Sequence, residues 1–111
     1  MTKIYLKNER EEYNSRRIAV CNELGITVNQ YNWFRREGTK LHKIYENNCN
    51  GLYESEEAYN VARCWVEERT DQKAQDLGLY IYYQTDPRGA TIYLDTKPIE
   101  RNAYTNAYCI Y

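Results

Sequence analysis

The sequence predicts an α+β fold in which three N-terminal helices pack on one face of a small C-terminal three-stranded antiparallel sheet. Apolar residues recur at helical spacing as far as residue 77, and the pattern changes to strict alternation from Leu79 onward. Glycines at 25, 51 and 78 divide the helical part into three. At 111 residues the chain has the size of one domain, with a helical part at 7–77 and a sheet part at 78–111.

The first helix is expected from about Asn8 to Leu24, after a short extended lead at residues 1–6, where polarity alternates. Gly25 is the expected stop signal. One face of this helix carries the residues expected to pack inward, which are Tyr13, Arg17, Val20, Cys21 and Leu24.

The second helix is expected to begin after the cap residue Thr27 and to reach about Asn48. Its apolar stripe comprises Val28, Tyr31, Phe34, Leu41, Ile44 and Tyr45. Gly38 falls on the same stripe, although glycine inside a helix costs about 1 kcal/mol relative to alanine. We therefore expect another helix to approach closely at Gly38.

The third helix is expected to begin at Ser55 and to end near Leu77 and Gly78. Its apolar stripe, with Trp65 as a core residue, comprises Ala58, Val61, Ala62, Trp65 and Val66. Residues 67–76 are almost wholly polar, so this half is expected to extend past the core or to cover it only with side-chain stems.

The sheet is predicted from two alternating segments around the turn Asp86-Pro87-Arg88-Gly89. Strands are expected at 79–84, 91–95 and 107–111, with a loop at 96–106 that contains one helical turn near 98–104. The inner face should hold Leu79, Ile81, Tyr83, Ile92, Leu94 and Ile110. The outer face should present Tyr80, Tyr82 and Tyr93 and extend to Tyr111.

Thirteen tyrosines and one phenylalanine make the outer face a candidate contact surface. Tyrosine suits positions where one end of the ring is buried and the other meets water or a partner. Three interpretations stay open at this point. The face could bind a protein, including a second copy of this chain; it could stack single-stranded nucleic acid; or the 96–106 loop or the C-terminal segment could cover it.

The hairpin turn contributes a further candidate residue, Arg88. Asp86, Pro87 and Gly89 each have a structural role in a turn, Gly89 by accepting a positive φ. Arg88 has no such role, and a guanidinium on a rigid tip is a good anchor for carboxylate or phosphate. The alternative is a solvated tip, or a salt bridge to Asp86 or Asp95.

A basic cluster on the second helix is the candidate nucleic-acid site. It consists of Arg35, Arg36, Lys40 and Lys43, with Trp33 beside them. Basic residues next to an aromatic ring can bind a phosphate backbone and stack a base. The alternative is an ordinary solvated helix face.

The sequence contains no recognisable catalytic or metal motif, so we expect a non-enzymatic protein without cofactor or metal. His42 is expected on a solvated face. A zinc site from His42, Cys49 and Cys64 is disfavoured because short ligand pairs are missing. The start of the chain is not a secretory signal and no segment has membrane-spanning length, which suggests a cytosolic protein with reduced thiols.

Residues 77–111 carry the strings LGLYIYYQTDPRGATIYLDTKPI and NAYTNAYCIY. They resemble the C-terminal half of a widespread small protein family encoded by bacteriophages, prophages and plasmids. Residues 33–51, WFRREGTKLHKIYENNCNG, resemble it more loosely. Relatives often carry histidine before the glutamine of the hairpin, where this chain has Tyr83.

The resemblance implies a mobile-element origin and a bacterial host cell, and no particular chemistry. Small phage proteins without enzymatic motifs are often host-takeover or anti-defence factors, including anti-CRISPR proteins. By that association we expect an interaction protein whose partner is a host protein or nucleoprotein complex. A small nucleic-acid-binding accessory protein is the alternative.

Overall fold

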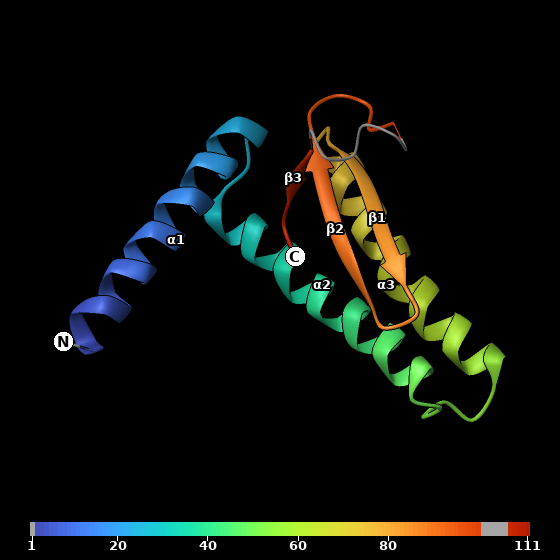
Figure 1. Ribbon diagram of the computed structural model, residues 1–111. Coiled ribbons are helices and arrows are strands. Elements are labelled where there is room, and N and C mark those ends of the chain that lie inside the picture. Colours follow the sequence, from blue (N-terminus) through green and yellow to red (C-terminus); the bar gives the residue numbers. More distant parts are fainter. Residues whose placement is uncertain (1, 101–106) are drawn as a thin grey trace.

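The computed structural model describes residues 2–100 and 107–111, with side chains from residue 10 onward. It confirms the predicted α+β architecture of three helices followed by a three-stranded antiparallel sheet of order β1-β2-β3 (Figure 1). The elements are α1 (Thr2–Leu24), α2 (Val28–Cys49), α3 (Glu56–Asp76), β1 (Tyr80–Asp86), β2 (Gly89–Asp95) and β3 (Tyr108–Cys109). No helix in the described part of the chain combines the length and the apolar character needed to cross a membrane.

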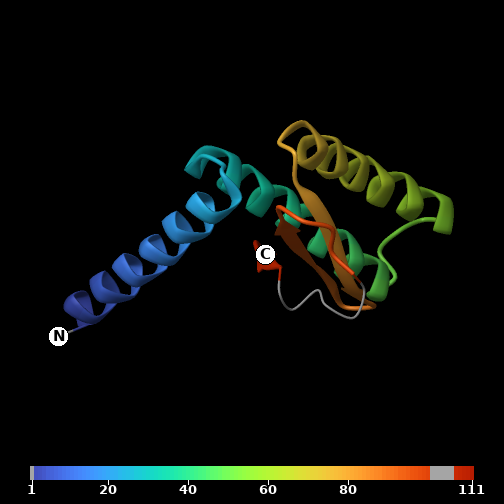
Figure 2. The same cartoon turned by 90° about the horizontal axis from the view of Figure 1, so that it is seen from above.

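Helix α1 begins at Thr2, so the predicted extended lead at residues 1–6 is wrong. Alternation over six residues is too short to separate strand from helix, and a strand needs a neighbour to pair with its backbone. The sheet offers none here, because α1 projects away from it (Figures 1 and 2). The predicted end is correct: Leu24 is the last helical residue, and Gly25 has a φ of 69°.

Helix α2 begins as predicted after Thr27, and a capping box stabilises this start. The backbone N–H of Gln30 donates to Thr27 Oγ1 at 3.1 Å, and the Thr27 N–H donates to Gln30 Oε1 at 2.8 Å. Tyr31, Phe34 and Leu41 are buried, and α2 contacts both β2 and α3. This helix is therefore the central element against which the others pack.

Helix α3 begins at its predicted cap, where Ser55 Oγ accepts the Ala58 N–H at 3.1 Å, but of its predicted core face only Val66 is buried. Val61 is 65% exposed and Trp65 is 57% exposed. The buried residues are Val66, Thr70 and Ala74, which follow one another at four-residue spacing.

The error in the predicted core face of α3 has a physical reason. Thr70 looks polar in the sequence, but its hydroxyl donates to carbonyl oxygens of its own helix, Val66 O and Glu67 O, each at 3.0 Å. The half of α3 expected to leave the core is thus the half that packs against it. Trp65 instead lies beneath the Arg69 guanidinium, 4.4 Å from the ring centroid, as a surface cation–π pair.

The sheet confirms the predicted inner face. Ile92, Leu94, Leu79 and Ile110 are buried and Ile81 is half-buried. Tyr83 also points inward as predicted: its hydroxyl donates to Asp71 Oδ1 at 2.7 Å and contacts the Thr70 hydroxyl, and burial raises its pKa. The ring thereby attaches β1 to α3.

The strand boundaries differ in detail from the prediction. Asp86 pairs with Gly89, so β2 begins two residues early and the hairpin loop contains only Pro87 and Arg88. β3 is limited to Tyr108–Cys109, shorter than the predicted 107–111. The helical turn predicted near 98–104 falls mainly on residues 101–106, which lie outside the described residues.

Gly38 admits a tyrosine and a strand side chain rather than another helix. A Cβ added to Gly38 would lie 2.7 Å from Tyr111 Cβ, 3.0 Å from Tyr111 Cγ and 3.4 Å from Ile92 Cδ1. Tyr111 therefore packs on α2 and does not extend the outer tyrosine face, because β3 has ended two residues earlier.

We expect Gly38→Ala to destabilise the protein although alanine favours helix by about 1 kcal/mol. Overpacking against Tyr111 costs about 1–3 kcal/mol, which outweighs that gain. In a Tyr111→Gly background the same change should raise the free energy of unfolding by roughly 1 kcal/mol. Urea denaturation of the four proteins measures both effects. An equal gain in both backgrounds would contradict the close contact.

Candidate interaction site at the hairpin

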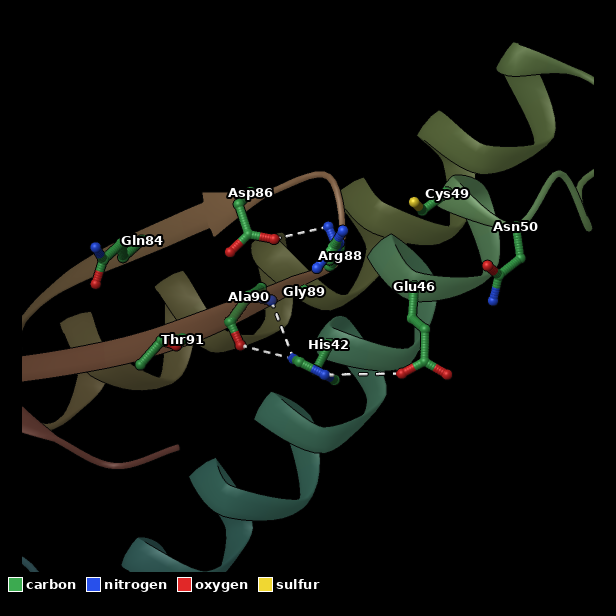
Figure 3. A pocket seen from close by; sticks show the side chains of 10 residues that line it. All are labelled: His42, Glu46, Cys49, Asn50, Gln84, Asp86, Arg88, Gly89, Ala90 and Thr91. Atoms are coloured by element: carbon green, nitrogen blue, oxygen red, sulfur yellow. Dashed lines mark hydrogen bonds and ion pairs between the residues drawn. The ribbon is translucent and has the colours of Figure 1, made fainter.

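The β1–β2 turn presents Arg88 on a constrained tip. Asp86 Oδ1 accepts the backbone N–H of Arg88 at 2.7 Å, which closes the turn from inside (Figure 3). The Arg88 side chain is exposed, and among the described residues it makes no ion pair with Asp86 or Asp95. Asp95 is buried and accepts the backbone N–H of Thr96 instead. Neither of the predicted salt bridges is therefore present.

Gly89 is required for a different reason from the one predicted. Its φ is not positive; only Gly25, Gly51 and Gly78 have positive φ in the described chain. A Cβ at position 89 would lie 2.1 Å from His42 Cε1 and 2.3 Å from His42 Nδ1, far closer than van der Waals contact. The glycine thus makes room for a side chain of α2.

His42 is partly exposed, in line with the expected solvated face, and it also makes a structural contact with the hairpin. Its Nδ1 lies 3.2 Å from the Ala90 backbone nitrogen and 3.4 Å from the Ala90 oxygen (Figure 3). The shorter contact fits the tautomer in which Nδ1 accepts the Ala90 N–H and the ring proton is on Nε2. Nε2 faces Glu46 Oε2 at 3.8 Å, and the ring packs edge-on against Tyr111, with centroids 5.4 Å apart.

This contact replaces a missing strand. β3 pairs with β2 at Tyr93 and Leu94 and does not extend to Ala90, so the edge of β2 is open there. The His42 imidazole occupies that edge and satisfies the exposed N–H. In the sequence, only the glycine after the turn hints at this contact. Helix periodicity does not indicate which strand a surface histidine reaches.

A groove of about 590 Å³ lies between the end of α2 and the hairpin. The residues that line it are His42, Glu46, Cys49, Asn50, Gln84, Asp86, Arg88, Gly89, Ala90 and Thr91 (Figure 3). The charged residues that line it are of both signs, Arg88 with a positive charge and Asp86 and Glu46 with negative charges. A surface of this kind suits a partner that also carries both charges.

The predicted outer tyrosine face is present on the other side of the sheet from the buried residues. Tyr80 is 48% exposed, and Tyr82 and Tyr93 are half-buried. Tyr82 and Tyr93 are direct cross-strand partners with ring centroids 6.4 Å apart. The Tyr93 hydroxyl donates to Gln84 Oε1 at 3.1 Å, which links this face to the groove. Coverage by residues 101–106 lies outside the described residues.

The basic cluster predicted on the second helix is divided by the fold. Lys40 and Lys43 each pair with a glutamate, Glu37 at 3.1 Å and Glu46 at 3.3 Å. Trp33 packs edge-on against Phe34, with Arg69 and Lys73 over its ring. Arg36 is exposed, whereas Arg35 turns to the Tyr13 ring on α1. Trp33 and Arg35 therefore have partners of their own, and two of the three residues on the exposed line of α2 already have a glutamate partner.

The cysteines are all free thiols. Cys49 shares the hairpin groove with His42, but Cys64 does not line it. Within the described part of the chain, no three His, Cys, Asp or Glu side chains are grouped closely enough to hold a metal ion.

His42→Ala should destabilise the protein by about 1–3 kcal/mol, since it leaves the Ala90 N–H without its acceptor. His42→Asn, which offers an oxygen near the position of Nδ1, should lose less stability than His42→Ala. Amide hydrogen exchange measures the effect directly: Ala90 should exchange at least about tenfold faster in His42→Ala. Unchanged protection of the Ala90 amide would contradict the proposed edge contact.

Comparison with known proteins assigns no family to this fold or this surface. No family model matches the chain, and neither a curated protein nor a solved structure matches it. The functional argument therefore depends on the geometry of the residues described above.

Proposed function

We propose that this chain is a non-enzymatic interaction protein that binds a partner protein through its hairpin surface. The hairpin surface comprises the Arg88 tip, the adjoining groove, and the face formed by Tyr80, Tyr82 and Tyr93. The observation that carries the proposal is an exposed arginine that makes no ion pair with any described residue, on a tip that is held from two sides. Asp86 holds the tip through the Arg88 N–H, and His42 holds it through Ala90.

Such a tip is suited to binding because little conformational freedom remains to be lost. Pro87 restricts its own φ, and the two-residue loop leaves the backbone of Arg88 few alternatives. The guanidinium can then make two parallel hydrogen bonds to a carboxylate of the partner. Arginine and tyrosine are also the residues most often found to dominate binding energy at protein interfaces.

The charges of the hairpin surface favour a protein over a bare nucleic-acid backbone. Asp86 and Glu46 line the same groove as Arg88, and their carboxylates would repel phosphates. The alternative, an accessory protein that binds nucleic acid through the second helix, has weaker support because Lys40 and Lys43 already have carboxylate partners.

The resemblance of residues 77–111 to a family carried by phages, prophages and plasmids gives the proposal its biological setting. We place the partner in the cytoplasm of a bacterial host, as a host protein or nucleoprotein complex. Inhibition of a defence system, in the manner of an anti-CRISPR protein, is the role that this setting favours. In that role, binding of the hairpin to the partner would compete with binding of the partner to its own target.

A second copy of the chain is an alternative partner for the same hairpin. Within the described residues β1 pairs on one side only, with β2, and it carries no charged side chain between Tyr80 and Thr85. An uncharged edge strand can pair with itself without like-charge repulsion. Light scattering of the free protein distinguishes a monomer from such a homodimer.

The combined variant Arg88→Ala, Tyr80→Ala and Tyr82→Ala should keep the fold and lose partner capture. Loss of interface residues of this type typically costs 2 kcal/mol or more, so captured partner should fall by at least about tenfold. Affinity capture from a bacterial host lysate, with quantitative mass spectrometry, measures this against wild type. Lys43→Ala, outside the hairpin surface, is the matched control, and thermal melts confirm folding. Undiminished capture by the folded triple variant would refute the proposal.

A further inference from the structure

A second groove, of about 430 Å³, lies where α1, α2 and the C-terminal residues meet. Its lining residues are Tyr13, Arg16, Arg17, Val20, Tyr31, Arg35, Cys109, Ile110 and Tyr111. None of them belongs to the hairpin groove. Three are arginines and none is acidic, although the whole chain has a net charge of −1. Positive charge is therefore concentrated at this place.

Arg17 is held in position by neutral groups. Its Nη1 donates to Asn32 Oδ1 at 3.2 Å and its Nη2 to Asn14 Oδ1 at 2.8 Å. The guanidinium also lies over the Tyr13 ring, 5.5 Å from the centroid. These contacts orient the guanidinium without neutralising its charge.

The Nε of Arg17 is the only buried side-chain nitrogen or oxygen of the described residues that lacks a hydrogen-bond partner. A buried N–H without an acceptor is unfavourable by about 1–3 kcal/mol. The Nε–H and a neighbouring Nη–H form one of the two-donor edges with which arginine binds paired oxygens. An oxyanion at this edge would satisfy the missing bond once the side chains that cover the buried Nε move aside.

The other two arginines also lack a carboxylate. Arg35 lies over the same Tyr13 ring, at 5.3 Å, and Arg16 is exposed at the rim. No ion pair involves either of them within the described part of the chain, whereas other cations on α2 and α3 do have glutamate partners, namely Lys40, Lys43, Arg63 and Arg69. The groove therefore lacks the internal counter-charges that these other cations have.

We infer that this groove is a binding site for the phosphate of a nucleotide, whose base lies against the Tyr111 ring. Guanidinium edges match phosphate oxygens in pairs, and the half-buried Tyr111 offers an aromatic surface to a base. The Tyr13 ring already lies under Arg17 and Arg35. The groove volume lies in the range of small-molecule sites. The nucleotide can be free or part of a single strand, since the phosphate and base are the same in both.

The groove rests on the proposed partner protein in no way, because it shares no residue with the hairpin surface. Nucleotide binding here would place the nucleic-acid function, predicted for the basic cluster on α2, in a groove between α1 and α2. Arg35 is the one residue of the predicted basic cluster that also lines this groove. Arg36, next to it in sequence, does not line the groove and provides a matched control.

The test uses the full chain and two ligands. Fluorescence anisotropy measures binding of a labelled single-stranded oligonucleotide of about 12 nucleotides, within the range of known single-strand sites. Isothermal titration calorimetry measures binding of a free nucleoside monophosphate. Arg35→Gln should weaken binding by at least about tenfold and reduce the salt dependence of the affinity, because a phosphate contact is lost. Arg36→Gln and Arg88→Ala should change the affinity by less than about threefold.

Each alternative outcome decides the matter. Binding of the oligonucleotide alone assigns the site to single strands, and binding of the monophosphate assigns it to free nucleotides. The inference is overturned if neither ligand binds at low salt, or if Arg36→Gln weakens binding as much as Arg35→Gln. Tighter binding of a poly-glutamate peptide than of the oligonucleotide would also overturn it in favour of a carboxylate partner. Arg16→Gln, at the exposed rim, repeats the test without disturbing the buried contacts of Arg17.

Discussion

The contact between α2 and β2 is the constraint on which the rest of the structure depends. Two residues one helical turn apart establish it. Gly38 lets Tyr111 and Ile92 approach the helix backbone, and His42 closes the edge of β2 at Ala90. Because one end of the strand is held by packing and the other by a hydrogen bond, the strand cannot slide or rotate along the helix. The position of the hairpin tip follows from these two contacts.

The distribution of ion pairs divides the surface into two kinds. Along α2 and α3 the glutamates neutralise nearby cations, and Glu37 alone serves both Lys40 and Arg69. The Arg88 tip and the groove that contains Arg17 are two places where the arginines have no ion pair within the described residues. The first is a mixed-charge surface suited to a protein, and the second is a uniformly basic one suited to phosphate. A small chain with a charge near zero can thus present two chemically different contact surfaces.

Local signals in the sequence predicted the fold class because each depends on only a few neighbouring residues. Thr27 and Ser55 mark helix starts through hydrogen bonds within three residues, and strand alternation predicted Ile92 as buried. The errors concern residues whose role depends on another element. Thr70 can be buried because its hydroxyl bonds to its own helix. Trp65 is exposed because the face of α3 that carries Thr70 is the one that packs inward.

The candidate site was predicted only in part for the same reason. Asp86, Arg88 and the tyrosines of the outer face are close in sequence, so their grouping followed from the turn and the strand period. The role of His42 depends on a contact with a residue 48 positions away, and helix spacing carries no information about it. The interlocking of the His42 ring with Gly89 has an evolutionary consequence. A side chain at position 89 and an imidazole at position 42 exclude one another, so a relative that retains this hairpin and carries a side chain at position 89 should lack histidine at position 42.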